Sequence, residues 1–101
     1  MNLVEIFIPL ADNDGRRFGA DLYEALRVDL TDRFGGVTVF RRAPADGTFQ
    51  SRGNVSRDEI IVFEVMTDHL DRAWWGAYRG QLETTFDQDE ILIRATAITK
   101  L

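Results

Sequence analysis

Four segments of the chain are dense in β-branched and aromatic residues whose side chains alternate between two faces, which predicts β-strands. These segments are 3–10, 37–41, 58–67 and 90–98. Between them, one segment carries an apolar residue at every fourth position, and a helical stripe of apolar residues also extends from about His69 to Phe86. The stripe of the first segment consists of Phe18, Leu22, Leu26 and Leu30. The predicted order is therefore strand, helix, two strands, helix, strand.

Turn and capping residues place the ends of the two helices. The segment 11–15 offers turn residues and N-cap candidates for a helix that begins near Arg16. The glycines at 35–36 end this helix, because glycine accepts the left-handed conformation that follows a helix. Asp68 is expected to cap the second helix, with Asp71 in its first turn.

This order of elements is the β-α-β-β-α-β order of ferredoxin-like α+β sandwiches. Right-handed crossovers place both helices on one face of a four-stranded antiparallel sheet with strand order 4-1-3-2. An open meander with separate helices is the competing arrangement. We expect one ferredoxin-like domain over residues 1–101, with a projecting arm at about 41–58 that contains a turn at 44–47 and a short hairpin.

Alternation gives the predicted sheet two different faces. The face toward the helices is apolar and consists of Val4, Ile6, Ile8, Val37, Val39, Ile61, Phe63, Val65, Ile91, Ile93 and Ala95. The opposite face, which we call the open face, mixes apolar and charged residues: Glu5, Phe7, Thr38, Phe40, Arg42, Val62, Glu64, Met66, Leu92, Arg94 and Thr96. Exposed apolar patches of this kind mark interfaces or ligand grooves, so we expect a homodimer formed through the open face and a possible small-molecule ligand there.

Two carboxylates, Glu5 and Glu64, are predicted to lie on adjacent central strands and to point to the open face. Close carboxylates can act as acid and base or hold a hard cation, which makes them the candidate catalytic residues. The alternative is an ionic ladder in which Arg94 and Arg42, on the flanking strands, pair with them. Arg42 and Arg94 are also the candidate residues for binding an anionic ligand.

Imidazole and aromatic side chains cluster in the second predicted helix, where His69 is followed by Trp74, Trp75 and Tyr78. Such a cluster suits an aromatic ligand, but packing of an apolar helix stripe explains most of it. Trp75 lies at the edge of the stripe, where it could reach an interface or the rim of a pocket. Trp75 and His69 are therefore further candidate ligand-binding residues.

Composition excludes several kinds of chemistry. The chain has no cysteine and one histidine, so thiolate sites and sites with two imidazoles are excluded, and we expect neither a metal nor a cofactor. A net charge of −5 argues against nucleic-acid binding. The arm at 41–57 carries four arginines and one aspartate, which suits a phosphate-bearing ligand or an acidic neighbouring subunit. The N-terminal segment lacks the features of a signal peptide or membrane span, and we expect a cytoplasmic protein.

The segment Phe34-Gly-Gly-Val-Thr-Val-Phe40, followed by Arg-Asp-Glu-Ile-Ile-Val-Phe-Glu-Val-Met at 57–66, resembles a family of short uncharacterised bacterial proteins. Members of that family share the Gly-Gly-Val-Thr-Val strand and a helix with two adjacent tryptophans. More distantly, the pattern is similar to the dimeric α+β barrel superfamily, which includes small monooxygenases, haem-degrading enzymes and non-enzymatic binders. The position of the arm is similar to that of the loop in trimeric PII-like signalling proteins.

Three hypotheses about function follow. The leading one is a non-enzymatic homo-oligomeric module that binds a small ligand or a protein through the open face. The second is a cofactor-independent enzyme of the dimeric-barrel type, monooxygenase- or isomerase-like, in which Glu5 or Glu64 is the base and Arg94 or Arg42 holds an anionic substrate. The third is a PII-like regulator that uses the basic arm.

Overall fold

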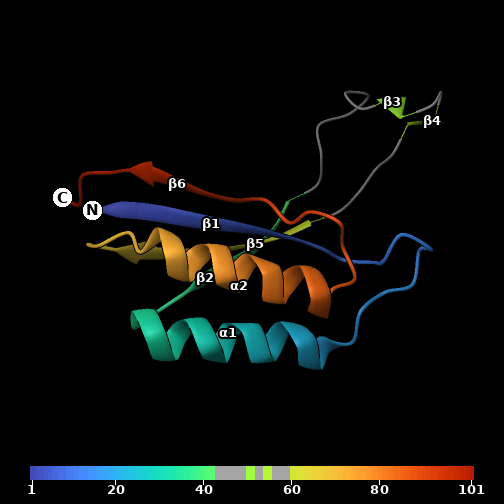
Figure 1. Ribbon diagram of the computed structural model, residues 1–101, viewed down its shortest axis with the longest axis horizontal. Coiled ribbons are helices and arrows are strands. Elements are labelled where there is room, and N and C mark those ends of the chain that lie inside the picture. Colours follow the sequence, from blue (N-terminus) through green and yellow to red (C-terminus); the bar gives the residue numbers. More distant parts are fainter. Residues whose placement is uncertain (43–49, 52–53, 56–59) are drawn as a thin grey trace.

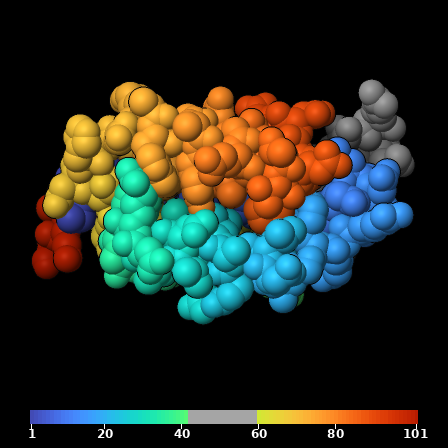
Figure 2. All heavy atoms as spheres, turned by 60° about the horizontal axis from the view of Figure 1, so that its bottom comes forward, coloured from blue at the N-terminus to red at the C-terminus, as the bar shows by residue number. Residues whose placement is uncertain are grey.

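The computed structural model describes residues 1–42, 50–51, 54–55 and 60–101. Four strands form an antiparallel sheet: β1 (Asn2–Pro9), β2 (Thr38–Arg42), β5 (Ile60–Thr67) and β6 (Ile93–Ala97). Two helices, α1 (Ala20–Phe34) and α2 (Arg72–Thr85), lie side by side on one face of this sheet (Figure 1, Figure 2). Two short strands, β3 (Gln50–Ser51) and β4 (Asn54–Val55), pair with each other as a separate hairpin.

The strand order confirms the predicted ferredoxin-like α+β fold. The sheet has the order β2-β5-β1-β6, which is the expected order 4-1-3-2 counted from the opposite edge. The first and third of the four long strands, β1 and β5, are central and pair along their full length. The two strands with the highest content of apolar residues therefore lie where both neighbours are strands.

The core lies between the sheet and the two helices. Phe63 of β5 and Ile6 and Ile8 of β1 are at most 1% exposed, and the helices contribute buried residues such as Leu30 and Phe86. At the sheet edges, the expected burial is incomplete: Val39 of β2 is 39% exposed and Ala95 of β6 is exposed. Two helices cover the central strands, but they leave part of both edge strands open.

The first helix begins later than the sequence pattern predicts. The carboxylate of Asp12 accepts hydrogen bonds from backbone N–H groups two and four positions further on, both at 2.9 Å. Gly15 within this turn has a left-handed φ of 84°. Asp12 thus closes a turn around residues 12–16 instead of capping a helix near Arg16, and α1 begins at Ala20. Its end is as expected, since Gly35 has a φ of 82°.

The second helix is capped by Asp71, not by Asp68 as predicted. The Asp71 carboxylate accepts a hydrogen bond from the backbone N–H of Trp74 at 3.1 Å, and the helix begins at Arg72. His69, expected in the first turn, lies before the helix. The capping geometry decides the start, because only a residue with extended backbone can turn its side chain back to the third N–H group.

Replacing Asp71 with alanine is expected to lower the free energy of unfolding by about 1 kcal/mol, the usual loss when an N-cap carboxylate is removed. The Asp68→Ala variant is the matched control, because Asp68 is exposed and does not cap the helix. Its stability should change by less than about 0.5 kcal/mol. Urea denaturation followed by circular dichroism measures both. Equal losses in the two variants would contradict the assignment of the cap.

The last strand begins later than predicted. The backbone N–H of Ile91 donates to the carboxylate of Glu83 in α2 at 3.0 Å, and β6 begins only at Ile93. In the arm, β3 and β4 form the predicted hairpin. The expected turn at 44–47 and the first two residues of the segment 58–67 lie outside the described residues.

Burial raises the pKa of the Tyr78 hydroxyl. Its side chain lies in α2, the residue is 9% exposed, and in the described part of the chain its hydroxyl has no hydrogen-bond partner. Desolvation, together with the nearby Asp29 carboxylate, raises the pKa of Tyr78 from 10.0 to about 12. The folded chain therefore favours the neutral phenol more strongly than the unfolded chain does.

Stability should therefore fall at alkaline pH. The contribution of Tyr78 to the free energy of unfolding is fully present below about pH 10. It is lost as the pH rises toward 12, and the total loss is about 2–3 kcal/mol. The Tyr78→Phe variant lacks the titrating group and should lose correspondingly less stability over this range, while at neutral pH it should be at least as stable as the wild type. Urea denaturation across the alkaline range measures both. An identical alkaline loss in the two proteins would contradict this assignment.

Among the described residues, no helix is both long and apolar enough to cross a membrane.

Candidate functional site

The charged residues of the open face lie in one row across the sheet. In the strand register, Glu5 of β1 is the partner of Glu64 in β5 on one side and of Arg94 in β6 on the other. Glu64 in turn has Thr38 of β2 as its partner. The structure thus brings the two candidate carboxylates together on neighbouring central strands, with one candidate arginine beside them.

The second candidate arginine, Arg42, does not belong to this row, and the register of β2 was open in the sequence. Arg42 is the partner of Ile60, at the far end of the β2–β5 pairing, and Thr38 occupies the position expected for an arginine. Arg42 lies four residues after Thr38 along β2, which is two rows away from the row of Glu5 and Glu64. Residue spacing alone defines the face, not the register.

Arg94 binds the Glu5 carboxylate directly. Its Nε donates to Oε1 of Glu5 at 2.9 Å, and its guanidinium carbon lies 4.8 Å from the centre of the Phe7 ring. Glu5 is only 9% exposed, whereas the Arg94 side chain is half exposed. The hydrogen bond from the guanidinium gives this buried carboxylate a defined orientation.

Apolar side chains border this charged row. Val62 is fully buried although it lies on the open face and is not part of the core between sheet and helices. Its partners in the register are Phe7 and Phe40, both partly buried. Further along the same face, Met66 and Leu92 are each 51% exposed. The open face therefore combines aromatic and aliphatic surface with an ion pair whose carboxylate is buried and whose guanidinium is half exposed.

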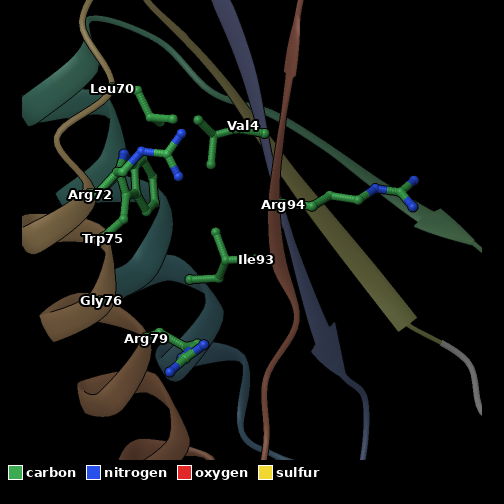
Figure 3. A pocket seen from close by; sticks show the side chains of 9 residues that line it. Val4, Leu70, Arg72, Trp75, Gly76, Arg79, Ile93 and Arg94 are labelled. Carbon is green, nitrogen blue, oxygen red and sulfur yellow. The ribbon is translucent and has the colours of Figure 1, made fainter.

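A cavity of about 290 Å³ lies on the other side of β6, between this strand and α2. Figure 3 shows Trp75 and Ile93 facing this space, with Arg72 and Arg79 of α2 toward its two ends and Arg94 pointing to the opposite side of β6. The full set of lining residues is Val4, Leu70, Arg72, Trp75, Gly76, Arg79, Ile93, Arg94 and Ala95.

The aromatic residues of α2 pack on one another and on Phe34 of α1. The Trp74 and Tyr78 rings stack at 4.8 Å between centroids, and the Trp75 ring stacks on Phe34 of α1 at 5.2 Å. Trp75 is 7% exposed and also lines the cavity, whereas His69 is exposed and lies outside this cluster. The structure thus separates these two candidate ligand-binding residues.

Two arginines of the cavity, Arg72 and Arg79, were not among the candidates from the sequence. The signal that could have revealed them is their spacing of seven residues, which places both on one face of α2. The described residues contain no group of three histidine, cysteine, aspartate or glutamate side chains that could hold a metal ion.

Comparison with known proteins identifies a similar fold but no family. No known family and no curated protein matches the chain. Among solved structures, a phage SAM lyase in its apo state matches with a TM-score of 0.60 and 11% identity, over 94% of this chain and 78% of that one. A phage SAM lyase in complex with S-methyl-5′-thioadenosine matches with a TM-score of 0.55 and 16% identity, over 94% of this chain and 79% of that one.

These matches correct the leading hypothesis from the sequence. That hypothesis was a non-enzymatic module, but the solved structures that share the fold over nearly the whole chain belong to an enzyme. At identities this low, the likeness itself establishes only the fold. The similarity to the dimeric α+β barrel superfamily and the formation of a homodimer stay predictions.

Proposed function

We propose that this chain is an enzyme that binds S-adenosylmethionine on the open face and cleaves it to S-methyl-5′-thioadenosine. The observation that carries the proposal is the buried Glu5, held at 2.9 Å by Arg94 and next to Glu64, in a fold shared with phage SAM lyase. S-methyl-5′-thioadenosine, which one of those structures binds, is the fragment left when the bond from sulfur to the amino-acid chain breaks.

The charges of this row suit the substrate. S-adenosylmethionine carries a sulfonium, an ammonium and a carboxylate, which together give one net positive charge. Glu5, Glu64 and Arg94 together have one formal negative charge when ionised. Arg94 would hold the substrate carboxylate, because a guanidinium and a carboxylate can form two parallel hydrogen bonds. The glutamates would face the cationic groups.

The aromatic residues of the open face suit the rest of the molecule. Phe7 already stacks against a guanidinium, and Phe40 lies two strands away in the same row as Val62. The face of a phenyl ring attracts cations such as a sulfonium and also packs against a flat base. This surface could therefore accept the adenosyl and sulfonium parts together.

The cleavage needs no redox partner. The bond between sulfur and the γ-carbon breaks, and its electron pair stays on sulfur, which becomes the neutral thioether of S-methyl-5′-thioadenosine. The γ-carbon can accept an oxygen of the substrate's own carboxylate, which forms a lactone, or a base can remove a β-proton, which forms an alkene. We favour the lactone route, because its nucleophile is a group of the substrate itself and it requires no base from the protein.

Incubation of the purified chain with S-adenosylmethionine tests the proposal. Chromatography should detect S-methyl-5′-thioadenosine above the rate of spontaneous breakdown, and proton NMR of the four-carbon fragment distinguishes lactone from alkene. Formation of S-adenosylhomocysteine would indicate methyl transfer, and no acceleration of breakdown would indicate that the shared fold serves another purpose here. Either result would contradict the proposal.

We also propose that a second copy of the chain covers the open face and shields the bound substrate from water. The half-exposed Met66 and Leu92 support this, since apolar side chains at the margin of a charged site lose contact with water when two such faces meet. Light scattering after size exclusion, across a dilution series, should give a mass above 11.5 kDa. A persistent monomer would contradict the covered face but not binding of S-adenosylmethionine.

A further inference from the structure

The cavity between α2 and β6 lies on the other side of β6 from Glu5 and Glu64, although Arg94 is also one of its lining residues. Along β6, Ile93 faces α2, whereas the side chain of Arg94 lies on the open face and binds Glu5 (Figure 3). Successive residues of a strand point to opposite sides of the sheet, so the strand itself divides the two regions. A molecule in this cavity would not occupy the row of Glu5 and Glu64.

Small residues on both sides keep this space open. Gly76 of α2 and Ala95 of β6 both line the cavity, and a Cβ atom built on Gly76 would have no heavy atom within 4 Å. Glycine inside a helix costs about 0.5–1 kcal/mol relative to alanine, and no backbone requirement at Gly76 explains its presence, since its φ is not left-handed. The helix thus carries an unfavourable residue where a side chain would fill the cavity.

The cavity is lined by apolar side chains in its middle and by one arginine toward each end. Leu70, Trp75 and Ile93 form the apolar part. Arg72 and Arg79 are seven residues apart on α2, which corresponds to about 10.5 Å along the helix axis.

Both arginines are available to an incoming anion. No described residue forms an ion pair or hydrogen bond with the Arg72 side chain, and the Nε atom of Arg79 lies 3.8 Å from a Glu83 carboxylate oxygen, too far for a hydrogen bond. Both side chains belong to exposed residues in a chain whose net charge is −5. Two guanidinium groups beside a cavity are therefore a local exception to the acidic character of the protein.

We propose that this cavity binds a small organic anion with a flat apolar body, whose carboxylate, sulfonate or phosphate group is held by Arg72 or Arg79. Trp75 and Ile93 would contact the apolar body, and the guanidinium would form two parallel hydrogen bonds with the anionic group. A volume of about 290 Å³ lies near the lower end of the range for ligand pockets, which restricts the ligand to about three aromatic rings or fewer.

The fluorescent probe 8-anilino-1-naphthalenesulfonate has this chemistry and tests the site directly. It should bind the folded chain at one site per protomer, with energy transfer from tryptophan to the probe. The Gly76→Leu variant places a side chain in the cavity and should weaken binding at least tenfold. Gly80→Leu is the matched control, because Gly80 lies in the same helix, has equally open surroundings and does not line the cavity. Both variants should keep the helix, since leucine favours helices more than glycine does.

The charge requirement is tested with Arg72→Gln, Arg79→Gln and the double variant. The double variant should bind the sulfonate probe about tenfold more weakly, as expected for loss of a charge-assisted hydrogen bond. Its affinity for N-phenyl-1-naphthylamine, the uncharged analogue, should be unchanged. Binding that survives Gly76→Leu would place the probe elsewhere, and equal losses for charged and uncharged probes would remove the role of the arginines. Either result would overturn the proposal. S-adenosylmethionine cleavage is a separate readout, which Gly76→Leu should leave intact.

Discussion

Replacing Phe63 with alanine is expected to lower the free energy of unfolding by about 3–5 kcal/mol. Phe63 lies in the middle of the central strand β5, is 1% exposed, and belongs to the core between the sheet and the helices. Its removal leaves a cavity that the surrounding strands cannot close, because both neighbouring strands are fixed by backbone hydrogen bonds. Since domains have a total stability of about 5–15 kcal/mol, urea denaturation should show a much lower midpoint or an unfolded chain.

The matched control is Met66→Ala on the same strand. Met66 is 51% exposed on the open face, so its truncation removes little buried surface and should cost less than about 1 kcal/mol in a monomer. A similar loss in both variants would mean that the open face is buried as deeply as the core. That result would support the proposed interface on the open face, whereas a loss below about 1 kcal/mol for Phe63→Ala would contradict its assignment to the core.

The order of elements and the two faces of the sheet could be predicted because they depend on local periodicity. Val4, Ile6 and Ile8 alternate with Glu5 and Phe7, and a period of two assigns each to a face whatever the partner strands do. The adjacency of Glu5 and Glu64 followed from the topology, since the fold makes β1 and β5 neighbours. Topology does not show which residues stand directly opposite each other, because that depends on the register of the strands.

The register could not be predicted, because it depends on where each strand begins. Thr38 stands opposite Glu64 only because β2 begins directly after Val37, and a shift of two residues would have kept the same side chains on the open face. The predicted starts of the two helices were wrong for a related reason. Asp12 and Asp71 have the same side chain, but one closes a turn and the other caps a helix, and the surrounding backbone decides which.

The cavity between α2 and β6 depends on tertiary packing and left only a faint signal in the sequence. Gly76 and Ala95 are small residues in separate elements, and nothing local shows that they face each other. Arg72 and Arg79 share a helix face, but exposed arginines at helical spacing usually face solvent. The relation became visible only when α2 was placed along β6.

Replacing Glu5 with glutamine is expected to lower kcat/KM for S-adenosylmethionine cleavage by about 10²–10³-fold, the usual effect of removing one electrostatic contact to the reacting groups. The amide keeps the volume of the carboxylate, and its oxygen can still accept the hydrogen bond from Nε of Arg94. The loss would therefore come from charge rather than shape. Because the Arg94 side chain is half exposed, stability should fall by less than about 1 kcal/mol. Initial rates of S-methyl-5′-thioadenosine formation measure the effect.

Comparing the affinities for substrate and product shows whether the Glu5→Gln substitution acts through the lost charge or through a changed structure. S-adenosylmethionine has a sulfonium and S-methyl-5′-thioadenosine does not, so calorimetry should show weaker binding of the substrate but nearly unchanged binding of the product. Glu24→Gln is the control, because Glu24 forms an exposed ion pair with Arg27 on α1, remote from the open face. Its rates and affinities should equal those of the wild type. If Glu5→Gln weakens both ligands equally, Glu5 supports the shape of the surface, and the charge complementarity behind the proposed function is lost.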